Sequence, residues 1–182
     1  FSLKNSNLNP YKNNFEKNML IGIIANITKE NVFEVVHSFL IRLKKNKIDY
    51  ILTKSLSEDK DKIKIELFDD FVTDDKEVYE KADLIISIGG DGTMLATAFN
   101  AQFYNKPVLG VKMGKLGFLV EANIDQMDKI ITELKEGKYS IEERMVISGE
   151  ALGHKTEKLY AINDIVIDKG GWPKMIELTV WV

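Results

Sequence analysis

The sequence predicts an α/β domain with a parallel, Rossmann-like sheet, followed by the beginning of an all-β domain. Up to residue 135, short apolar segments alternate with amphipathic helical segments, which is typical of a parallel sheet covered on both faces. From residue 139 onward the pattern predicts strands alone, over 139–149, 158–168 and 175–182, separated by turn signals at Gly153 and at Gly170-Gly171. We therefore expect three parts: a polar leader over 1–18, an α/β nucleotide-binding domain over 19–122, and a connecting helix with an incomplete β domain over 123–182.

The elements of the α/β part follow from apolar spacing. Four short apolar segments rich in Ile, Leu and Val are predicted as buried strands, over residues 20–25, 50–53, 83–88 and 107–111. Helical spacing of apolar residues, or an acidic first turn, predicts helices from Val32 to Leu43, over 73–81, from Met94 onward and over 124–135. We expect Thr28 to cap the first helix and Gly137 to end the last one. The segment 55–75 is ambiguous between a loop and a short strand.

Composition excludes several classes of function. The chain has 182 residues, a net charge of −3 and a pI near 5.5, which gives no support for binding to nucleic acid or to a membrane surface. There is no cysteine, so disulfides and thiolate metal sites are excluded, and two histidines do not predict a zinc site. No apolar run reaches membrane-spanning length and no signal peptide is recognised, so we expect a cytoplasmic protein. The alternating pattern at the end of the chain leads us to expect further sequence after Val182.

The most informative stretch is Gly89-Gly90-Asp91-Gly92-Thr93, which lies between a predicted buried strand and a predicted helix. We expect its three glycines to turn sharply, to adopt positive φ and to let the backbone approach a ligand closely. The N-terminus of the helix then offers N–H groups and a positive dipole end, which suit phosphate. Gly89, Gly90, Gly92 and Thr93 are therefore predicted to bind phosphate.

Asp91 does not fit a passive phosphate site, because a carboxylate repels a neighbouring phosphate. It fits if Asp91 holds a cation that bridges phosphates, or if it accepts a proton from a hydroxyl that is about to be phosphorylated. The motif thus indicates a hydroxyl kinase with Asp91 as its catalytic residue. The structural alternative is a tight turn in which Asp91 or Thr93 only caps the helix.

Three further features carry weaker signals. Asn163 and Asp164 interrupt an apolar run, either as a bulge that directs polar groups at a ligand such as a ribose, or as a simple turn. Residues 114–119 form a glycine-containing loop that is either part of a site or a plain crossover. Lys174 either reaches a pyrophosphate or is an ordinary surface lysine.

In this order and spacing, the motif at 89–93, the segment 114–119 and the pair Asn163-Asp164 resemble the NAD kinase family, over residue 19 to the end. The resemblance implies an N-terminal α/β domain and a C-terminal β domain with NAD bound between them. It implies transfer of the terminal phosphate of ATP, or of polyphosphate, to the 2′-hydroxyl of the adenosine ribose, giving NADP. It also implies a homodimer or homotetramer and a divalent cation, usually Mg²⁺.

By the same resemblance, Asp91 is the base and contacts NAD together with Gly92. Asn163 and Asp164 contact NAD, and a basic residue often stands where Lys174 does. No protein residue is expected to form a metal site of its own. The family also carries a Thr-Pro-Thr-Gly-Ser-Thr-Ala-Tyr segment beyond the position where this chain ends, and that segment supplies further NAD contacts.

Three other functions share part of the pattern. Lipid and sphingoid kinases carry the first motif, but the segment 114–119 and the pair Asn163-Asp164 argue against them. A phosphofructokinase-like sugar kinase should show basic residues for a sugar phosphate, which are not found. A nucleotide-binding fragment without turnover is the non-enzymatic alternative. The sequence leaves open the phosphate donor, the choice between NAD and NADH, the oligomer size and feedback regulation.

Overall fold

The computed structural model of the chain describes residues 19–58, 74–113, 122–152, 158–168, 170–171, 175 and 177–181. It forms two units, residues 1–143 and residues 144–182. The segment 114–119, the predicted leader and Lys174 therefore lie outside the described residues.

The first unit is built on a five-stranded parallel sheet with the strand order β2-β1-β3-β4-β5. Its strands are β1 (Leu20–Ala25), β2 (Asp49–Leu52), β3 (Leu84–Gly89), β4 (Val108–Lys112) and β5 (Ala122–Asn123). The four predicted strands are confirmed to within two residues at either end. The central strand β3 is buried along its whole length, as a strand covered on both faces must be.

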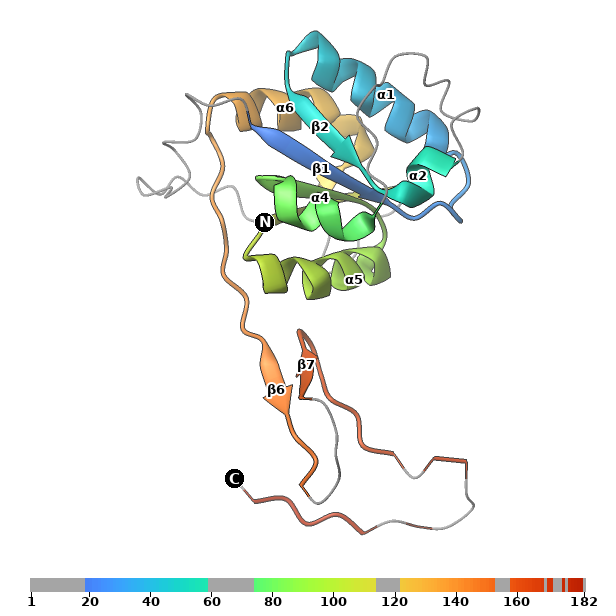
Figure 1. Cartoon of the computed structure of the whole chain (residues 1–182), viewed down its shortest axis with the longest axis vertical. Helices are drawn as coiled ribbons and strands as arrows, with labels where there is room; N and C mark the ends of the chain where they lie inside the picture. The colour runs from blue at the N-terminus through green and yellow to red at the C-terminus, as the bar shows by residue number, and fades with distance from the viewer. Residues whose placement is uncertain are drawn as a thin grey trace. The chain divides into compact units, whose positions relative to one another are not determined.

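Helices cover both faces of this sheet, as Figure 1 shows. On one face lie α1 (Val32–Lys45) and α6 (Met127–Lys135), and on the other α4 (Asp75–Lys81) and α5 (Asp91–Ala101). The side chains of β3 alternate between the two cores: Ile86 and Ile88 pack with α1 and α6, whereas Ile85 packs with α4 and α5. The predicted architecture of the first unit is thus confirmed.

The described part of this unit also contains short helical turns: α2 (Lys54–Glu58), η2 (Gln102–Tyr104) and η3 (Ile124–Gln126). The segment that was ambiguous in the sequence therefore begins with the helix α2, and residues 59–73 lie outside the described part of the chain.

The ends of the helices confirm one cap and correct another. Gly137 ends α6 as predicted: its φ is 62° and its N–H donates to the carbonyl of Leu134 at 3.2 Å. The predicted capping role of Thr28 is wrong, because α1 begins after Asn31, whose φ is 59°. Thr28 instead donates its N–H and its hydroxyl to the Asn26 side chain, at 3.1 and 2.7 Å, in a local turn after β1.

The second unit contains an antiparallel pair, β6 (Ile147–Gly149) with β7 (Leu159–Ala161). These strands are much shorter than the predicted 139–149 and 158–168, and the described part of 175–182 contains no strand. The apolar residues that suggested strands there are exposed, including Val166, Ile167, Val180 and Trp181. An alternating pattern forms a strand only where a neighbour pairs with it, which explains the shortfall. The domain limits proposed from the sequence stay a prediction.

Candidate functional site

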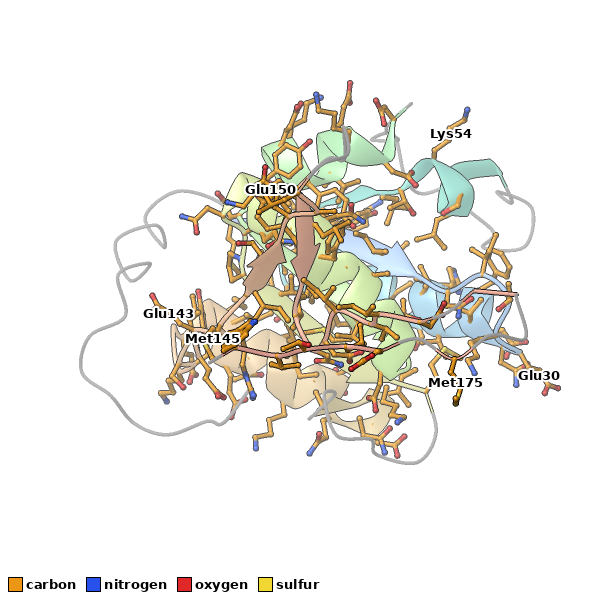
Figure 2. The ribbon with its side chains drawn as sticks, turned by 90° about the horizontal axis from the view of Figure 1, so that it is seen from below. Glu30, Lys54, Glu143, Met145, Glu150 and Met175 are labelled. Atoms are coloured by element: carbon orange, nitrogen blue, oxygen red, sulfur yellow. The ribbon has the colours of Figure 1, made fainter. Side chains whose placement is uncertain are left out.

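The candidate site lies at the edge of the sheet where the parallel strands end. The chain leaves β1 toward α1 on one face and leaves β3 toward α5 on the other, although β1 and β3 are neighbours. Open α/β sheets bind their ligands outside such a point, where neighbouring connections diverge. The two loops are joined there, because the N–H of Asn26 donates to the carbonyl of Ile88 at 3.0 Å. Figure 2 shows Glu30 and Lys54, which follow β1 and β2, extending outward at this same edge.

The glycine motif forms the junction between β3 and α5. Gly90 is the last residue before the helix, and its φ of −117° and ψ of −171° are extended values that most residues can adopt. The predicted positive φ in this motif is therefore wrong: among the described glycines, positive φ occurs at Gly137 and Gly170. The first intrahelical bond runs from the N–H of Met94 to the carbonyl of Gly90 at 3.0 Å. The N–H groups that precede it have no acceptor within the helix, as at any helix start.

The structure gives a different reason for these glycines, which is space. A Cβ on Gly89 would lie 2.4 Å from Oγ1 and 2.7 Å from Cβ of Thr93, so the strand end and the helix start are in close contact. A Cβ on Gly90 or Gly92 would meet nothing within 4 Å. Gly89 therefore serves packing, whereas Gly90 and Gly92 leave the backbone open to an approaching group.

The helix-capping alternative for Asp91 and Thr93 is not what the structure shows. The N-cap is Gly90, which has no side chain to accept a hydrogen bond, and Asp91 is already the first helical residue. A carboxylate in the first turn interacts favourably with the positive end of the helix dipole. Asp91 is thus stabilised at the start of α5 while its side chain stays one third exposed.

Asp91 has a cationic neighbour, Lys112, at the end of β4. The Lys112 ammonium Nζ lies 3.8 Å from Asp91 Oδ1, and the Lys112 side chain is 18% exposed. Lys112 is in register with Gly89 across the sheet, and the next N–H, of Met113, donates to the Gly89 carbonyl at 3.2 Å. Sequence analysis did not single out Lys112. Lys112 could have been found from the sequence, because residues at the carboxyl ends of neighbouring parallel strands meet at the same edge of the sheet.

Two buried hydroxyls fix the start of α5 against β3. Ser87 and Thr97 are both buried, and their hydroxyl oxygens lie 2.9 Å apart in a hydrogen bond. The Thr97 hydroxyl also lies 2.8 Å from the carbonyl of Thr93 and donates to it. A buried polar pair is costly unless it is satisfied, so this one holds the first turn of the helix in a defined place.

The remaining predicted site residues belong to the second unit or lie outside the described residues. Asn163 and Asp164 are exposed and follow β7 in the second unit. They lie past the β6–β7 ladder, so the structure shows no bulge within it. Lys174 falls outside the described residues. In the first unit, the motif Gly89 to Thr93 therefore meets Lys112, and the roles of the other residues stay predictions.

The described residues contain no group of three or more His, Asp or Glu side chains arranged to hold a metal ion. Asp91 is accordingly a single carboxylate beside a cation rather than part of an acidic cluster. In the same described part of the chain, no helix is both long and apolar enough to cross a membrane.

Comparison with known proteins agrees with this geometry. The family model "ATP-NAD kinase N-terminal domain" matches residues 21–139, from β1 through the end of α6. A curated NAD kinase of Clostridium perfringens is 33% identical over 163 residues, covering 89% of this chain and 54% of the relative. One from Natranaerobius thermophilus is 36% identical over 160 residues, covering 87% and 54%.

A solved structure, yeast NADH kinase complexed with NADH, shares the fold at a TM-score of 0.65 and 18% identity. The match covers 80% of this chain and 47% of the yeast protein. The chain thus spans about half the length of the proteins that it matches. The parallel sheet, the Gly-Gly-Asp-Gly-Thr junction at its carboxyl edge and the match over residues 21–139 lead to one conclusion: this chain belongs to the ATP-NAD kinase family.

Proposed function

We propose that the protein from which this chain comes phosphorylates NAD, transferring the terminal phosphate of ATP or polyphosphate to the 2′-hydroxyl of the adenosine ribose. One observation carries the proposal within the family: Asp91 stands at the first residue of α5, between two glycines whose backbone is open to a ligand. Curated relatives with the name NAD kinase support the choice of substrate.

In the proposed reaction, the ribose 2′-oxygen forms a bond to the terminal phosphorus of the donor. The bond from that phosphorus to its bridging oxygen breaks, and ADP, or the shortened polyphosphate, leaves with the bonding electron pair. The hydroxyl proton passes to the Asp91 carboxylate and then to solvent. Transfer of a phosphoryl group depends chiefly on alignment and charge neutralisation, so Asp91 orients the hydroxyl and accepts its proton late.

The start of α5 holds phosphate in this proposal. The first-turn N–H groups and the positive dipole end provide donors and charge, and Gly90 and Gly92 add no side chain that would keep a phosphate away. Gly89 and Thr93 contribute by holding the strand end against the helix start. The buried Ser87–Thr97 pair keeps this turn rigid during transfer.

We propose that a divalent cation, Mg²⁺, enters together with the phosphate donor. Mg²⁺ usually keeps several waters and is bound through substrate phosphates with few protein carboxylates, so it does not require an acidic cluster among the described residues. When bound, the ion neutralises phosphate charge. The protein's own contribution is the position of Asp91, which the helix start and Lys112 define.

The proposal extends to the second unit and to the assembly. Asn163 and Asp164 are proposed to contact NAD, through an amide that donates and accepts and a carboxylate that accepts from ribose hydroxyls. Lys174 is proposed to contact the pyrophosphate. We further propose a cytoplasmic homodimer or homotetramer, in keeping with the resemblance on which these roles rest.

The test is product formation by the protein at its full natural length. NAD, ATP and Mg²⁺ are supplied, and NADP is measured with an NADP-specific dehydrogenase, which responds to a 2′-phosphate and not to other phosphorylated products. We expect NADP to accumulate in step with ADP. ADP release without NADP, or phosphorylation of a diacylglycerol in place of NAD, would contradict the proposal. The 182-residue chain assayed alongside shows whether this part binds nucleotide without turnover.

A further inference from the structure

We propose that Lys112 is a positioning residue for phosphoryl transfer, which holds the Asp91 carboxylate in place and offsets its charge toward the incoming phosphates. The inference rests on the proposed function and names a residue that neither the motif nor the resemblance supplied. It starts from the ion pair between Lys112 Nζ and Asp91 Oδ1, at 3.8 Å.

The ion pair between Lys112 and Asp91 reduces the repulsion between the Asp91 carboxylate and a phosphate donor. Asp91 alone would place a negative charge where a donor with several negative charges must approach, and like charges within a few ångströms repel strongly at a partly buried site. The Lys112 ammonium brings the summed charge of the two side chains to zero. The Asp91 side chain can then accept a proton without repelling the donor.

Lys112 is held differently from Lys76, Lys81 and Lys129, which also form ion pairs in the described part of the chain. Its side chain is 18% exposed, whereas Lys76, Lys81 and Lys129 are 56–61% exposed in their pairs with glutamates one helical turn away. Surface pairs of that kind contribute little, because water screens them and the side chains are mobile. Enclosure of Lys112 limits both effects, so its charge acts on Asp91 from a defined position.

Strand pairing on both sides of Lys112 fixes the backbone that carries it. Lys112 is the last residue of β4 and is in register with Gly89 of β3 on one side and with Asn123 of β5 on the other. Asp91 follows Gly89 by two residues, at the start of a helix fixed by the Ser87–Thr97 hydrogen bond. Lys112 is therefore carried by β4, and Asp91 by the first turn of the helix that follows the neighbouring strand β3.

During transfer, Lys112 keeps all its protons, and no bond to it forms or breaks. The ammonium holds the Asp91 carboxylate in place while the 2′-hydroxyl proton transfers to it, and it acts on the reaction only through Asp91. Loss of Lys112 should therefore misplace the base and lower kcat.

The test uses Lys112→Met in the protein at its full natural length, with NADP formation as the readout. We expect kcat to fall about 10- to 100-fold, the scale that misplacing a catalytic group costs, while KM for NAD changes less than about threefold. Lys112→Arg, which keeps the charge, should recover most of the turnover. The matched control is Lys129→Met, which removes the lysine of an exposed pair at nearly the same distance, 3.7 Å, and should leave kcat unchanged.

A double-mutant cycle separates positioning of Asp91 from a purely structural role. If Lys112 acts through Asp91, adding Lys112→Met to Asp91→Asn should lower kcat by less than about threefold further. The full single-mutant loss in both backgrounds would overturn the inference, and so would wild-type turnover in Lys112→Met. Lys112→Gln, which keeps a polar side chain, replaces the Met variant if thermal unfolding shows that the latter does not fold.

The outcomes distinguish the inference from the proposed function. A wild-type protein that forms no NADP refutes the proposed function, and the positioning role of Lys112 in that reaction fails with it. A wild-type protein that forms NADP, together with a fully active Lys112→Met variant, refutes the role of Lys112 alone and leaves the proposed function standing.

Discussion

Replacing Gly89 by alanine tests the structural reason for glycine at the end of β3. The added Cβ would lie 2.4 Å from Thr93 Oγ1, about 1 Å inside the 3.4 Å at which ordinary contact begins. Rotating the threonine side chain does not relieve the clash, because Thr93 Cβ itself would be 2.7 Å away. The helix start or the strand end must shift, and overpacking of this kind costs about 1–3 kcal/mol of stability.

The other two glycines of the motif are matched controls, because each change adds the same single methyl group. Gly90→Ala meets no atom within 4 Å and has no left-handed φ, so we expect a stability change within about 0.5 kcal/mol. Gly92→Ala lies in the first turn of α5 and should stabilise the protein by up to about 1 kcal/mol, since alanine favours helix. Both should nevertheless impair nucleotide binding if a ligand approaches that backbone.

The assay is equilibrium unfolding in denaturant of the wild type and the three variants, followed by titration of each with ATP. The reasoning requires Gly89→Ala to be the least stable of the three. Equal stability of all three variants would refute the assignment of Gly89 to packing. Normal ATP binding by both Gly90→Ala and Gly92→Ala would refute the idea that these glycines make room for a ligand.

Two other changes test what holds the site and what does not. Thr97→Val removes one hydroxyl of the buried Ser87–Thr97 pair and leaves the Ser87 hydroxyl without that partner. Stability in denaturant unfolding should therefore fall by about 1–3 kcal/mol. A loss below about 0.5 kcal/mol would show that the pair contributes little to stability. Arg42→Gln breaks the exposed pair between α1 and α6, whose Arg42 Nε and Asp128 Oδ1 lie 3.0 Å apart, and should cost under about 1 kcal/mol by the same measurement. A larger effect would mean that this link fixes α6 on α1.

Much of the first unit was predictable from the sequence, because its signals are strong and local. Ile85, Ile86 and Ile88 form part of an apolar run that only Ser87 interrupts. Such a run is typical of a strand with helices on both faces, and the structure buries all three isoleucines. Apolar residues at helical spacing likewise located α1 and α6. Both patterns reflect burial in a core, and each can be read from one segment at a time.

The predictions that failed concern residues whose side chains or backbone allow more than one local structure. Thr28 has the right chemistry for a helix cap, but the Asn26 side chain accepts its N–H and hydroxyl in a turn, and α1 starts later. Glycine permits positive φ without requiring it. The sequence alone therefore did not show that Gly90 is extended and leaves space beside its backbone. Sequence patterns report which conformations are allowed, and neighbouring atoms decide among them.

The candidate site shows the same limit. Asp91 was found because its motif is continuous in the sequence, whereas its partner Lys112 is 21 residues away and is placed by pairing of β3 with β4. In the second unit, alternating apolar residues such as Val180 predicted a strand that the described residues do not form. Strand pairing is a long-range contact, which no local pattern specifies.

The most direct test of the central claim, that Asp91 serves the phosphorylation of NAD, is the kcat of Asp91→Asn in the protein at its full natural length. The amide keeps the shape of the side chain and removes its capacity to accept the hydroxyl proton. NADP formation at saturating NAD and ATP should fall by roughly 10²–10⁴-fold, the usual contribution of a general base. A variant that retains turnover within about threefold of the wild type would contradict the role assigned to Asp91.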